Sequence, residues 1–404
     1  MSHADHSTNT IISQSHPFWQ RIICGWARRI SHGRLTLVFP DGQEMICAGQ
    51  EAGPAATLRL KSSRLVWKLL RSGSIGFAES YMDGDWESPD VAVLLELALI
   101  NEEHLKDVIA APVISRICAR IRHTLRRNTR SGSRRNIAFH YDLGNAFYSA
   151  WLDDTMTYSS ALYHRDDLSL DEAQKAKYDR IIDELAIGPD DHVLEIGCGW
   201  GGFAERAIRR TGCRVTGLTL SSEQAKFAIE RLAKAGLADR SDIRLEDYRD
   251  IRGRFTKIVS IEMFEAVGEE NWPVYFSRVR ELLSDGGKAI VQVITIDESR
   301  FDFYRRGADF IQTYIFPGGM LPSVTAFETT ATKAGLAVTD RLRFGRDYER
   351  TLLLWDRAFS GNWPRIRSLG FDERFHRTWR YYLHYCAAGF RTGRLDVVQF
   401  TLER

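Results

Sequence analysis

The ten residues from Val193 to Gly202, VLEIGCGWGG, carry the strongest chemical signal in the chain. An apolar run leads to an acidic side chain, Glu195, and a glycine-rich loop follows. Glycines let a backbone approach a ligand closely, and open α/β sheets bind ligands at the carboxyl ends of their strands. The spacing G-x-G-x-G-G differs from the dinucleotide pattern G-x-G-x-x-G, and no Lys-Ser/Thr pair marks a phosphate loop. The pattern predicts a ligand site after a buried strand, and its alternative is a simple turn.

The elements that must position this loop follow from the periodicity after residue 136. Apolar, strand-like runs alternate with helical segments, at 191–197, 213–219, 256–262 and 286–294. This alternation predicts an α/β fold built on a doubly wound parallel sheet. Polar residues follow two further strands of that sheet: Thr219, Leu220, Ser221 and Gln224 after the second, and Asp247, Tyr248 and Arg249 after the third.

The strand, the acidic residue and the glycine loop resemble the first motif of class I S-adenosylmethionine (SAM) methyltransferases, which have a Rossmann-like sheet. The resemblance implies that Glu195 and the loop hold the methionine part of SAM, through Gly197, Cys198, Gly199 and Gly201. The polar residues after the second strand are candidates for the ribose hydroxyls. Tyr248 is expected to stack on the adenine, and Asp247 to accept from its amine. Each of these side chains alone could instead be a helix cap or a surface group.

Length and composition indicate two globular domains. The chain has 404 residues, 44% apolar and 27% charged, with a net charge of +2. We expect a disordered tail at 1–15, a small α+β domain at 16–115, an Arg-rich linker at 116–135 and the methyltransferase domain at 136–404. The six cysteines lack metal-ligand spacing, which predicts reduced thiols in a cytoplasm and no metal site. No apolar run reaches the roughly 18 residues of a membrane span, and no signal peptide is recognisable.

The segment 116–135 contains eight arginines and no acidic residue. It is either a solvated hinge or an electrostatic contact with an anionic surface. Anionic lipid fits such a segment, at about 1 kcal/mol per basic residue. Aromatic residues are not interleaved with these arginines and no nucleic-acid motif is present, so no nucleic acid is expected. The segment therefore favours peripheral association with the inner face of a membrane.

Five further segments resemble the cyclopropane-fatty-acyl-phospholipid synthase family, which includes the mycolic acid cyclopropane synthases: 136–163, 256–268, 309–323, 348–355 and 386–404. The resemblance implies transfer of a methylene from SAM to the cis double bond of an acyl chain in a membrane phospholipid. The steps are methyl transfer, a carbocation, deprotonation and ring closure. A small-molecule methyltransferase and a lipid-binding protein with an inactive methyltransferase domain are the alternatives of other kinds. Homodimers are common in the family, so a homodimer is also expected.

The resemblance further implies a bound bicarbonate ion as the base. Glu265 matches the residue that orients the ion, Ile294 contacts it through its backbone, and Tyr348 completes the set. Two positions depart from the family, because Ser160 replaces a cysteine and Gln292 stands where many members have histidine. Neither side chain carries the charge of an imidazole, although both can donate hydrogen bonds. Slow or misdirected deprotonation would replace the ring with a methyl or methylene branch, which keeps a fatty-acyl C-methyltransferase open.

Four other residues complete the expected site. Tyr158 and Ser159 match residues that contact the cofactor. His140 either caps the site or is a structural histidine. Cys386 matches a cysteine once assigned as catalytic, and its alternative is a structural role, because the mechanism requires no cysteine nucleophile.

Overall fold

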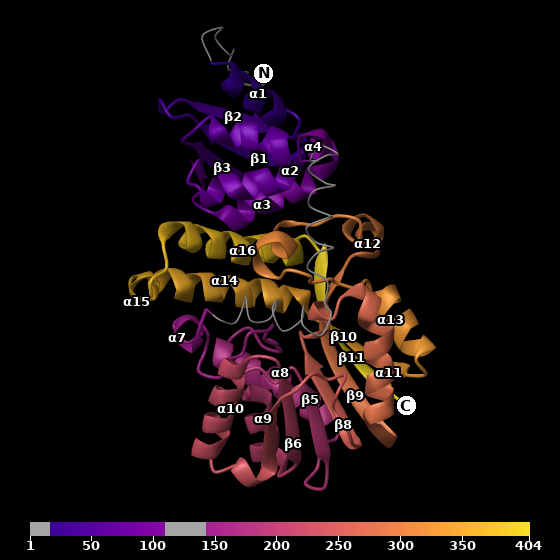
Figure 1. The fold of residues 1–404 in the computed structure, drawn as a ribbon. Coiled ribbons are helices and arrows are strands. Elements are labelled where there is room, and N and C mark those ends of the chain that lie inside the picture. The colour runs from indigo at the N-terminus through magenta and orange to yellow at the C-terminus, as the bar shows by residue number, and fades with distance from the viewer. Residues whose placement is uncertain (1–16, 110–142) are drawn as a thin grey trace, which may run out of the picture. The chain divides into compact units, whose positions relative to one another are not determined.

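The computed structural model describes residues 17–109 and 143–404 (Figure 1). The expected tail at 1–15, the Arg-rich segment at 116–135 and His140 lie outside the described residues. Contacts within the chain divide it into two compact units, residues 1–115 and 116–404, and each unit has its own sheet. Among the described residues, no helix has both the length and the apolar character needed to cross a membrane.

The first unit combines a four-stranded sheet with helices, as the sequence predicts. The strands are β1 (His32–Val38), β2 (Glu44–Ala48), β3 (Glu51–Leu60) and β4 (Trp86–Glu87), in the order β2-β1-β3-β4. β1 and β3 pair in parallel, and the two outer pairs are antiparallel. The helices are α1 (Phe18–Ala27), α2 (Arg64–Met82), α3 (Val91–Ile100) and α4 (Glu102–Ile109).

The second unit is built on a seven-stranded sheet with the order β10-β11-β9-β8-β5-β6-β7. Its strands are β5 (His192–Ile196), β6 (Arg214–Thr219), β7 (Ser241–Leu245), β8 (Phe255–Ile261), β9 (Leu283–Ile296), β10 (Ala337–Arg343) and β11 (Leu395–Glu403). β5 to β9 run parallel, which confirms the doubly wound arrangement. The sheet is not wholly parallel, because β11 inserts antiparallel between β9 and β10. The alternating pattern did not reveal this strand, since two long helices separate it from β10.

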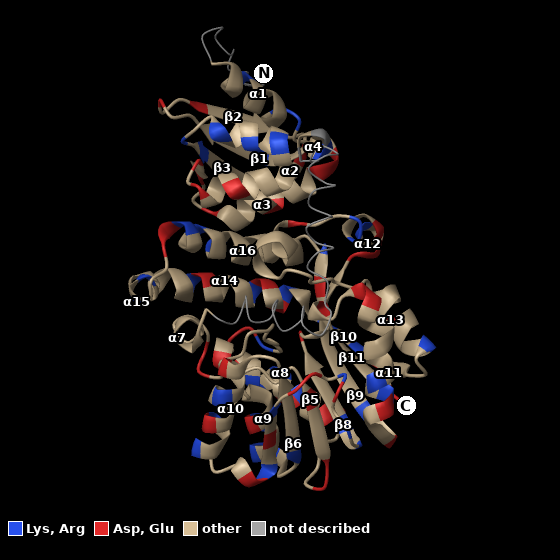
Figure 2. Ribbon diagram, viewed as in Figure 1, with Lys and Arg blue, Asp and Glu red and all other residues tan. Residues whose placement is uncertain are grey.

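Two hydrophobic cores cover the two faces of this sheet. Ile258 of β8 belongs to one core and Val259 to the other, as expected for side chains that alternate along a strand. Helices α8 (Leu170–Glu184) and α9 (Gly202–Thr211) pack on the face of Val259. Helices α11 (Trp272–Leu282) and α13 (Val324–Lys333) pack on the face of Ile258. Figure 2 shows the central strands mostly free of charge, and both signs of charge on α9 and α10 (Ser222–Lys234).

Local sequence explains where the helices around the site begin. Ser169 and Glu172 form a capping box at the start of α8, and Ser221 accepts the Gln224 N–H at the start of α10. Gly217 in β6 allows a close approach, because a Cβ there would lie 2.7 Å from Ile243 Cδ1 and 2.9 Å from Cys198 Cβ. The glycine loop therefore packs directly against β6.

Helices α14 (Gly345–Gly361) and α16 (Glu373–Arg391) form a pair that packs against β11. The chain between β9 and β11 also contains two shorter helices, α12 (Glu298–Tyr304) and α15 (Trp363–Ser368). A buried ion pair joins α14 to α16: Asp356 accepts from Arg380 Nε at 2.9 Å and lies 3.1 Å from His384 Nε2. Burial would raise the pKa of Asp356, but His384 and Arg380 outweigh it and lower this pKa below its usual range.

We expect Asp356→Asn to lower the free energy of unfolding by about 3 kcal/mol, because removing one charge of a buried pair leaves the other uncompensated. Chemical denaturation measures this change. Glu373→Gln on the same helix is the control, since Glu373 is exposed and should change stability by less than about 1 kcal/mol. Equal effects of the two substitutions would contradict a structural role for the buried pair.

Candidate functional site

The carboxyl edge of the parallel strands gathers most of the predicted site residues. Glu195 lies in β5, Thr219 ends β6, and Glu262 follows β8 directly. Ile294 lies near the end of β9 and completes the row. Because parallel strands end at one edge of a sheet, residues far apart in the chain meet there, next to the point where the strand order reverses.

Glu195 is buried, and its Oε2 atom has no hydrogen-bond partner among the described residues. Burial raises the pKa of Glu195 well above its usual range, against the charges of Arg231 and Lys177. A buried polar atom without a partner is costly, so this oxygen is expected to meet a ligand or water. The neighbouring Cys198 thiol is also buried, and burial raises its pKa.

The glycine loop is packed at two of its glycines and open at a third. A Cβ at Gly197 would lie 2.8 Å from Met263 Cγ, and one at Gly201 would lie 3.1 Å from Ala228 Cβ. A Cβ at Gly199 would meet no atom within 4 Å among the described residues, and the φ of Gly199 is +52°. The loop thus leaves space beside Gly199 that a side chain would begin to fill.

The polar residues after β6 bind one another. Thr219 Oγ1 donates to Gln224 Oε1 at 2.8 Å and accepts the Ser221 N–H at 3.1 Å. Ser221 in turn accepts the Gln224 N–H at 3.3 Å, as the cap of α10. Leu220 lies between them in the turn. These residues cap α10, and they could also bind a ligand, because none of these bonds uses the side-chain amide nitrogen of Gln224.

Asp247, Tyr248 and Arg249 lie together after β7. Arg249 donates to both carboxylate oxygens of Asp247, at 2.8 and 2.6 Å. The centroid of the Tyr248 ring lies 5.5 Å from the guanidinium of Arg249 and 5.4 Å from the ring centroid of Tyr275. Burial raises the pKa of Tyr248 to about 12. The pairing with Arg249 competes with the expected role of Asp247 as an acceptor for adenine.

A second cluster centres on Glu262, which the sequence analysis did not single out. The Ser160 N–H donates to Glu262 Oε1 at 2.8 Å, and Gln292 Nε2 donates to the same oxygen at 2.7 Å. The Tyr348 hydroxyl is also hydrogen-bonded to this carboxylate. Burial raises the pKa of Glu262, and the charge of Lys177 opposes this rise. Its position as an acidic residue directly after a buried strand was the signal that could have found it.

Glu265 lies beside this cluster, with different partners. Its Oε1 atom accepts the Ile294 N–H at 2.6 Å, and its Oε2 atom is buried without a hydrogen-bond partner among the described residues. Burial raises the pKa of Glu265 to about 8, and the charge of Glu262 adds to the rise. This raised pKa favours the neutral form of Glu265 at neutral pH, which reduces the negative charge that Glu265 places beside Glu262.

Lys177 of α8 is the second residue that the sequence analysis missed. It is fully buried, and its ammonium donates to Ser159 Oγ at 2.6 Å and to Gln174 Oε1 at 2.7 Å. Burial lowers the pKa of Lys177 to about 7, while Glu262, Asp153 and Glu195 act in the opposite direction. No motif marks this lysine in the sequence, since only the fold brings α8 against residues 158–160.

Aromatic side chains adjoin the carboxylate cluster through Tyr348. The Tyr348 and Trp355 rings lie 5.9 Å apart, and Trp355 lies 5.3 Å from Tyr158. The Tyr158 hydroxyl bonds the Tyr382 hydroxyl at 2.7 Å. Cys386 lies on the same helix as Tyr382, and burial raises the pKa of its thiol, which keeps it neutral. A neutral thiol fits the structural alternative better than a nucleophile.

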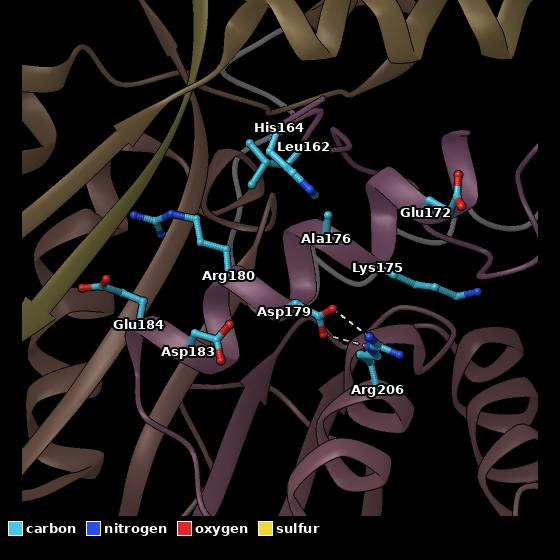
Figure 3. Close-up of a pocket in the computed structure, with 10 residues that line it drawn as sticks. All are labelled: Leu162, His164, Glu172, Lys175, Ala176, Asp179, Arg180, Asp183, Glu184 and Arg206. Carbon is cyan, nitrogen blue, oxygen red and sulfur yellow. Dashed lines mark hydrogen bonds and ion pairs between the residues drawn. The ribbon is translucent and has the colours of Figure 1, made fainter. Parts of the chain in front are cut away.

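A surface pocket along α8 is separate from these clusters (Figure 3). Its lining includes Leu162 and His164 before the helix and Arg206 of α9, and none of the predicted site residues. Both arginines of the lining are already paired, because Arg206 bonds Asp179 at 2.7 and 2.8 Å and Arg180 bonds Asp340 at 2.8 Å. The predicted site residues therefore lie away from this pocket, and most of them lie at the carboxyl edge of the sheet.

Comparison with known proteins agrees with this geometry. Residues 128–400 match the family described as mycolic acid cyclopropane synthetase. The chain is 39% identical over 387 residues to a tuberculostearic acid methyltransferase of Mycobacterium tuberculosis, covering 93% of this chain and 89% of the relative. It is 36% identical over 357 residues to the cyclopropane-fatty-acyl-phospholipid synthase of Escherichia coli, covering 86% and 88%.

A solved structure extends the similarity to the fold. The mycolic acid cyclopropane synthase CmaA1, complexed with SAH and CTAB, is 34% identical and superimposes with a TM-score of 0.64. The match covers 67% of this chain and 98% of that protein. The chain therefore belongs to the mycolic acid cyclopropane synthetase family, and it is a SAM-dependent methyltransferase related to the cyclopropane-fatty-acyl-phospholipid synthases and fatty acid methyltransferases.

Proposed function

We propose that this enzyme adds the methyl carbon of SAM to the cis double bond of an unsaturated acyl chain in a membrane phospholipid and then removes one proton. The acyl chain gains a CH2 unit, which closes as a cyclopropane ring. The observation that carries this proposal is the partly neutralised carboxylate cluster of Glu262 and Glu265, which adjoins aromatic rings through Tyr348. The cluster provides a proton acceptor, and the rings can stabilise a cation.

The residues after β5 fit SAM. The partnerless Oε2 of Glu195 and the open space at Gly199 suit a ligand that carries a positive charge and an amino group. SAM, when bound, supplies an electrophilic methyl group. The chain contributes the acidic side chain of Glu195, the close backbone of the loop and the buried Tyr248 ring. These residues bind and orient the cofactor, and the remaining chemistry falls to the second cluster.

A methyl- or methylene-branched chain is the second candidate product. Ring closure and an exocyclic methylene both require loss of a proton from the transferred methyl group, and a saturated methyl branch requires a hydride donor instead. Two observations favour a branch: Ser160 and Gln292 depart from the family pattern, and a relative with 39% identity is a tuberculostearic acid methyltransferase. The two candidates share the first step and differ in the fate of the cation.

We propose that the enzyme meets its substrate at the inner face of a membrane. Trp67, Leu70 and Arg71 of α2 are exposed within one turn of the helix, a combination typical of interfacial segments. Peripheral binding and the homodimer implied by the family remain predictions, as does the contribution of segment 116–135.

The Gly199→Ala substitution tests the cofactor site. We expect SAM affinity, measured by calorimetry, to fall at least about tenfold, because a Cβ enters the open space of the loop. Gly236→Ala is the matched control, since Gly236 has a φ of +72° and equally free surroundings but lies at the end of α10. Both variants should lose about 1–2 kcal/mol of stability from left-handed strain. Equal SAM affinity in the two variants would contradict the assignment of the loop.

Two substitutions at Glu265 test its protonation. Because the pKa of Glu265 is raised to about 8, Gln resembles the neutral side chain and keeps an acceptor for the Ile294 N–H. We expect Glu265→Gln to keep turnover at pH 7 within about tenfold of wild type, and Glu265→Ala to lose at least another tenfold. Wild-type turnover should decline as the pH rises through about 8, and the Gln variant should lack this decline. A Gln variant as damaged as the Ala variant would refute a neutral Glu265.

The product is identified with SAM that carries a trideuterated methyl group, vesicles of monounsaturated phospholipid and mass spectrometry of the released fatty acids. We expect two retained deuterons, because one is removed from the transferred methyl group. Mild hydrogenation then separates a cyclopropane from a methylene branch. Three retained deuterons would mean a saturated methyl branch, and absence of label from lipid despite SAM binding would refute the proposed substrate.

A further inference from the structure

Glu262 has a backbone conformation that residues other than glycine rarely adopt. Its φ is +50°, in the left-handed region, although it is not a glycine. Such strain persists where the surroundings hold the residue, and it concentrates at functional sites. Here the Glu262 N–H donates to the Gln292 carbonyl at 2.8 Å, so the same residue of β9 holds both its backbone and its side chain.

The partners of Glu262 are residues that the family resemblance assigns to bicarbonate. Of that set, Ser160 and Gln292 donate to Glu262 Oε1, and Tyr348 bonds the same carboxylate. The Ile294 N–H, which was expected to contact the ion, donates to Glu265 instead. Four residues of the expected anion site thus bind a carboxyl group of the chain, and the fifth, Glu265, provides one.

The orientation of Gln292 supports a built-in acceptor site. Gln399 Nε2 donates to Gln292 Oε1 at 2.9 Å, and Arg180 donates to Gln399 Oε1 at 2.6 Å. This series of bonds turns the Gln292 amide nitrogen toward Glu262. Glutamine at position 292, where many family members have histidine, thus donates a hydrogen bond to Glu262 and, unlike an imidazole, does not titrate near neutral pH.

We propose that Glu262 occupies the position of bicarbonate in this enzyme and accepts the proton that the transferred methyl group loses. The inference rests on the proposed function. The double bond supplies the electrons for the new carbon–carbon bond, and sulfur keeps the electron pair of the bond that breaks. A C–H bond of the new methyl group then breaks, its proton passes to a Glu262 oxygen, and its electron pair closes the ring or, after a hydride shift, forms the methylene double bond.

The electrostatics of the cluster suit this role. Burial raises the pKa of Glu262 and so makes its carboxylate a stronger base than one in water. The raised pKa of Glu265 reduces the competing negative charge, and the charge of the nearby Lys177 opposes the rise in the pKa of Glu262. A carboxylate tethered to the backbone also needs no dissolved ion to be captured in each turnover.

The first test compares dependence on bicarbonate. Wild-type turnover, measured with SAM and monounsaturated phospholipid vesicles, should change less than about twofold between buffer freed of carbon dioxide and buffer with added bicarbonate. A loss of tenfold or more on depletion, restored by bicarbonate, would overturn the proposal.

The second test uses Glu262→Gln, which preserves size and removes the basic oxygen. We expect turnover to fall at least about 100-fold, the usual contribution of a general base, with SAM affinity unchanged. Glu281→Gln is the control, because Glu281 is exposed and pairs with Arg278 on the same helix. Wild-type turnover of Glu262→Gln would overturn the proposal.

The third test uses Glu262→Gly, which suits the left-handed backbone and opens a space where the carboxylate was. We expect this variant to bind ¹³C-labelled bicarbonate in NMR experiments and to regain at least about tenfold in turnover when bicarbonate is added, and the wild type to show no binding. Bicarbonate binding by the wild type would contradict the inference. The NMR experiment tests the position of Glu262 without relying on turnover. The deuterium-label experiment tests the proposed function, so absence of label from lipid with the wild-type enzyme would refute that function alone.

Discussion

The half-buried carboxyl group of Glu262, directly after β8, is the constraint on which the catalytic unit depends. A carboxylate removed from water is costly unless donors and a cation surround it. Ser160, Gln292 and Tyr348 provide the donors, and Lys177 provides the cation. These residues belong to the segment before α8, to β9, to α14 and to α8 itself. The interactions of the Glu262 carboxyl group therefore bring four segments of the chain together around the end of β8.

The same constraint explains the composition of the sheet interior near the site. Gln292 and Gln399 are buried polar residues in adjacent antiparallel strands, β9 and β11, where apolar side chains would be usual. Their amides are bonded to each other and to Arg180 and Glu262, so neither is left unsatisfied. The inserted strand β11 thus contributes to the core and also orients the Gln292 amide, through the hydrogen bond from Gln399.

The two halves of the site follow different physical rules. The cofactor half is a local feature, in which consecutive glycines and one acidic residue create a cradle between β5 and α9. The other half, which we propose for proton transfer, is assembled from distant segments, and burial raises the pKa of Glu265 and lowers that of Lys177. In the proposed mechanism, the first half binds the methyl donor and the second half determines the fate of the cation.

The sequence by itself determined the α/β fold, four of the parallel strands to within a few residues and the position of the glycine loop, because these depend on local periodicity and on neighbouring residues. It also pointed to Glu265, Ile294, Tyr348, Ser160 and Gln292 through the family resemblance, although their roles remain predictions. Only the tertiary structure decided that β11 runs antiparallel, that Lys177 is buried beside Ser159, and that Glu262 binds the residues expected to hold an ion. The physical reason is distance along the chain: Glu262 meets partners 102 and 30 positions away, and no local pattern encodes which side chains a packed sheet edge will bring together.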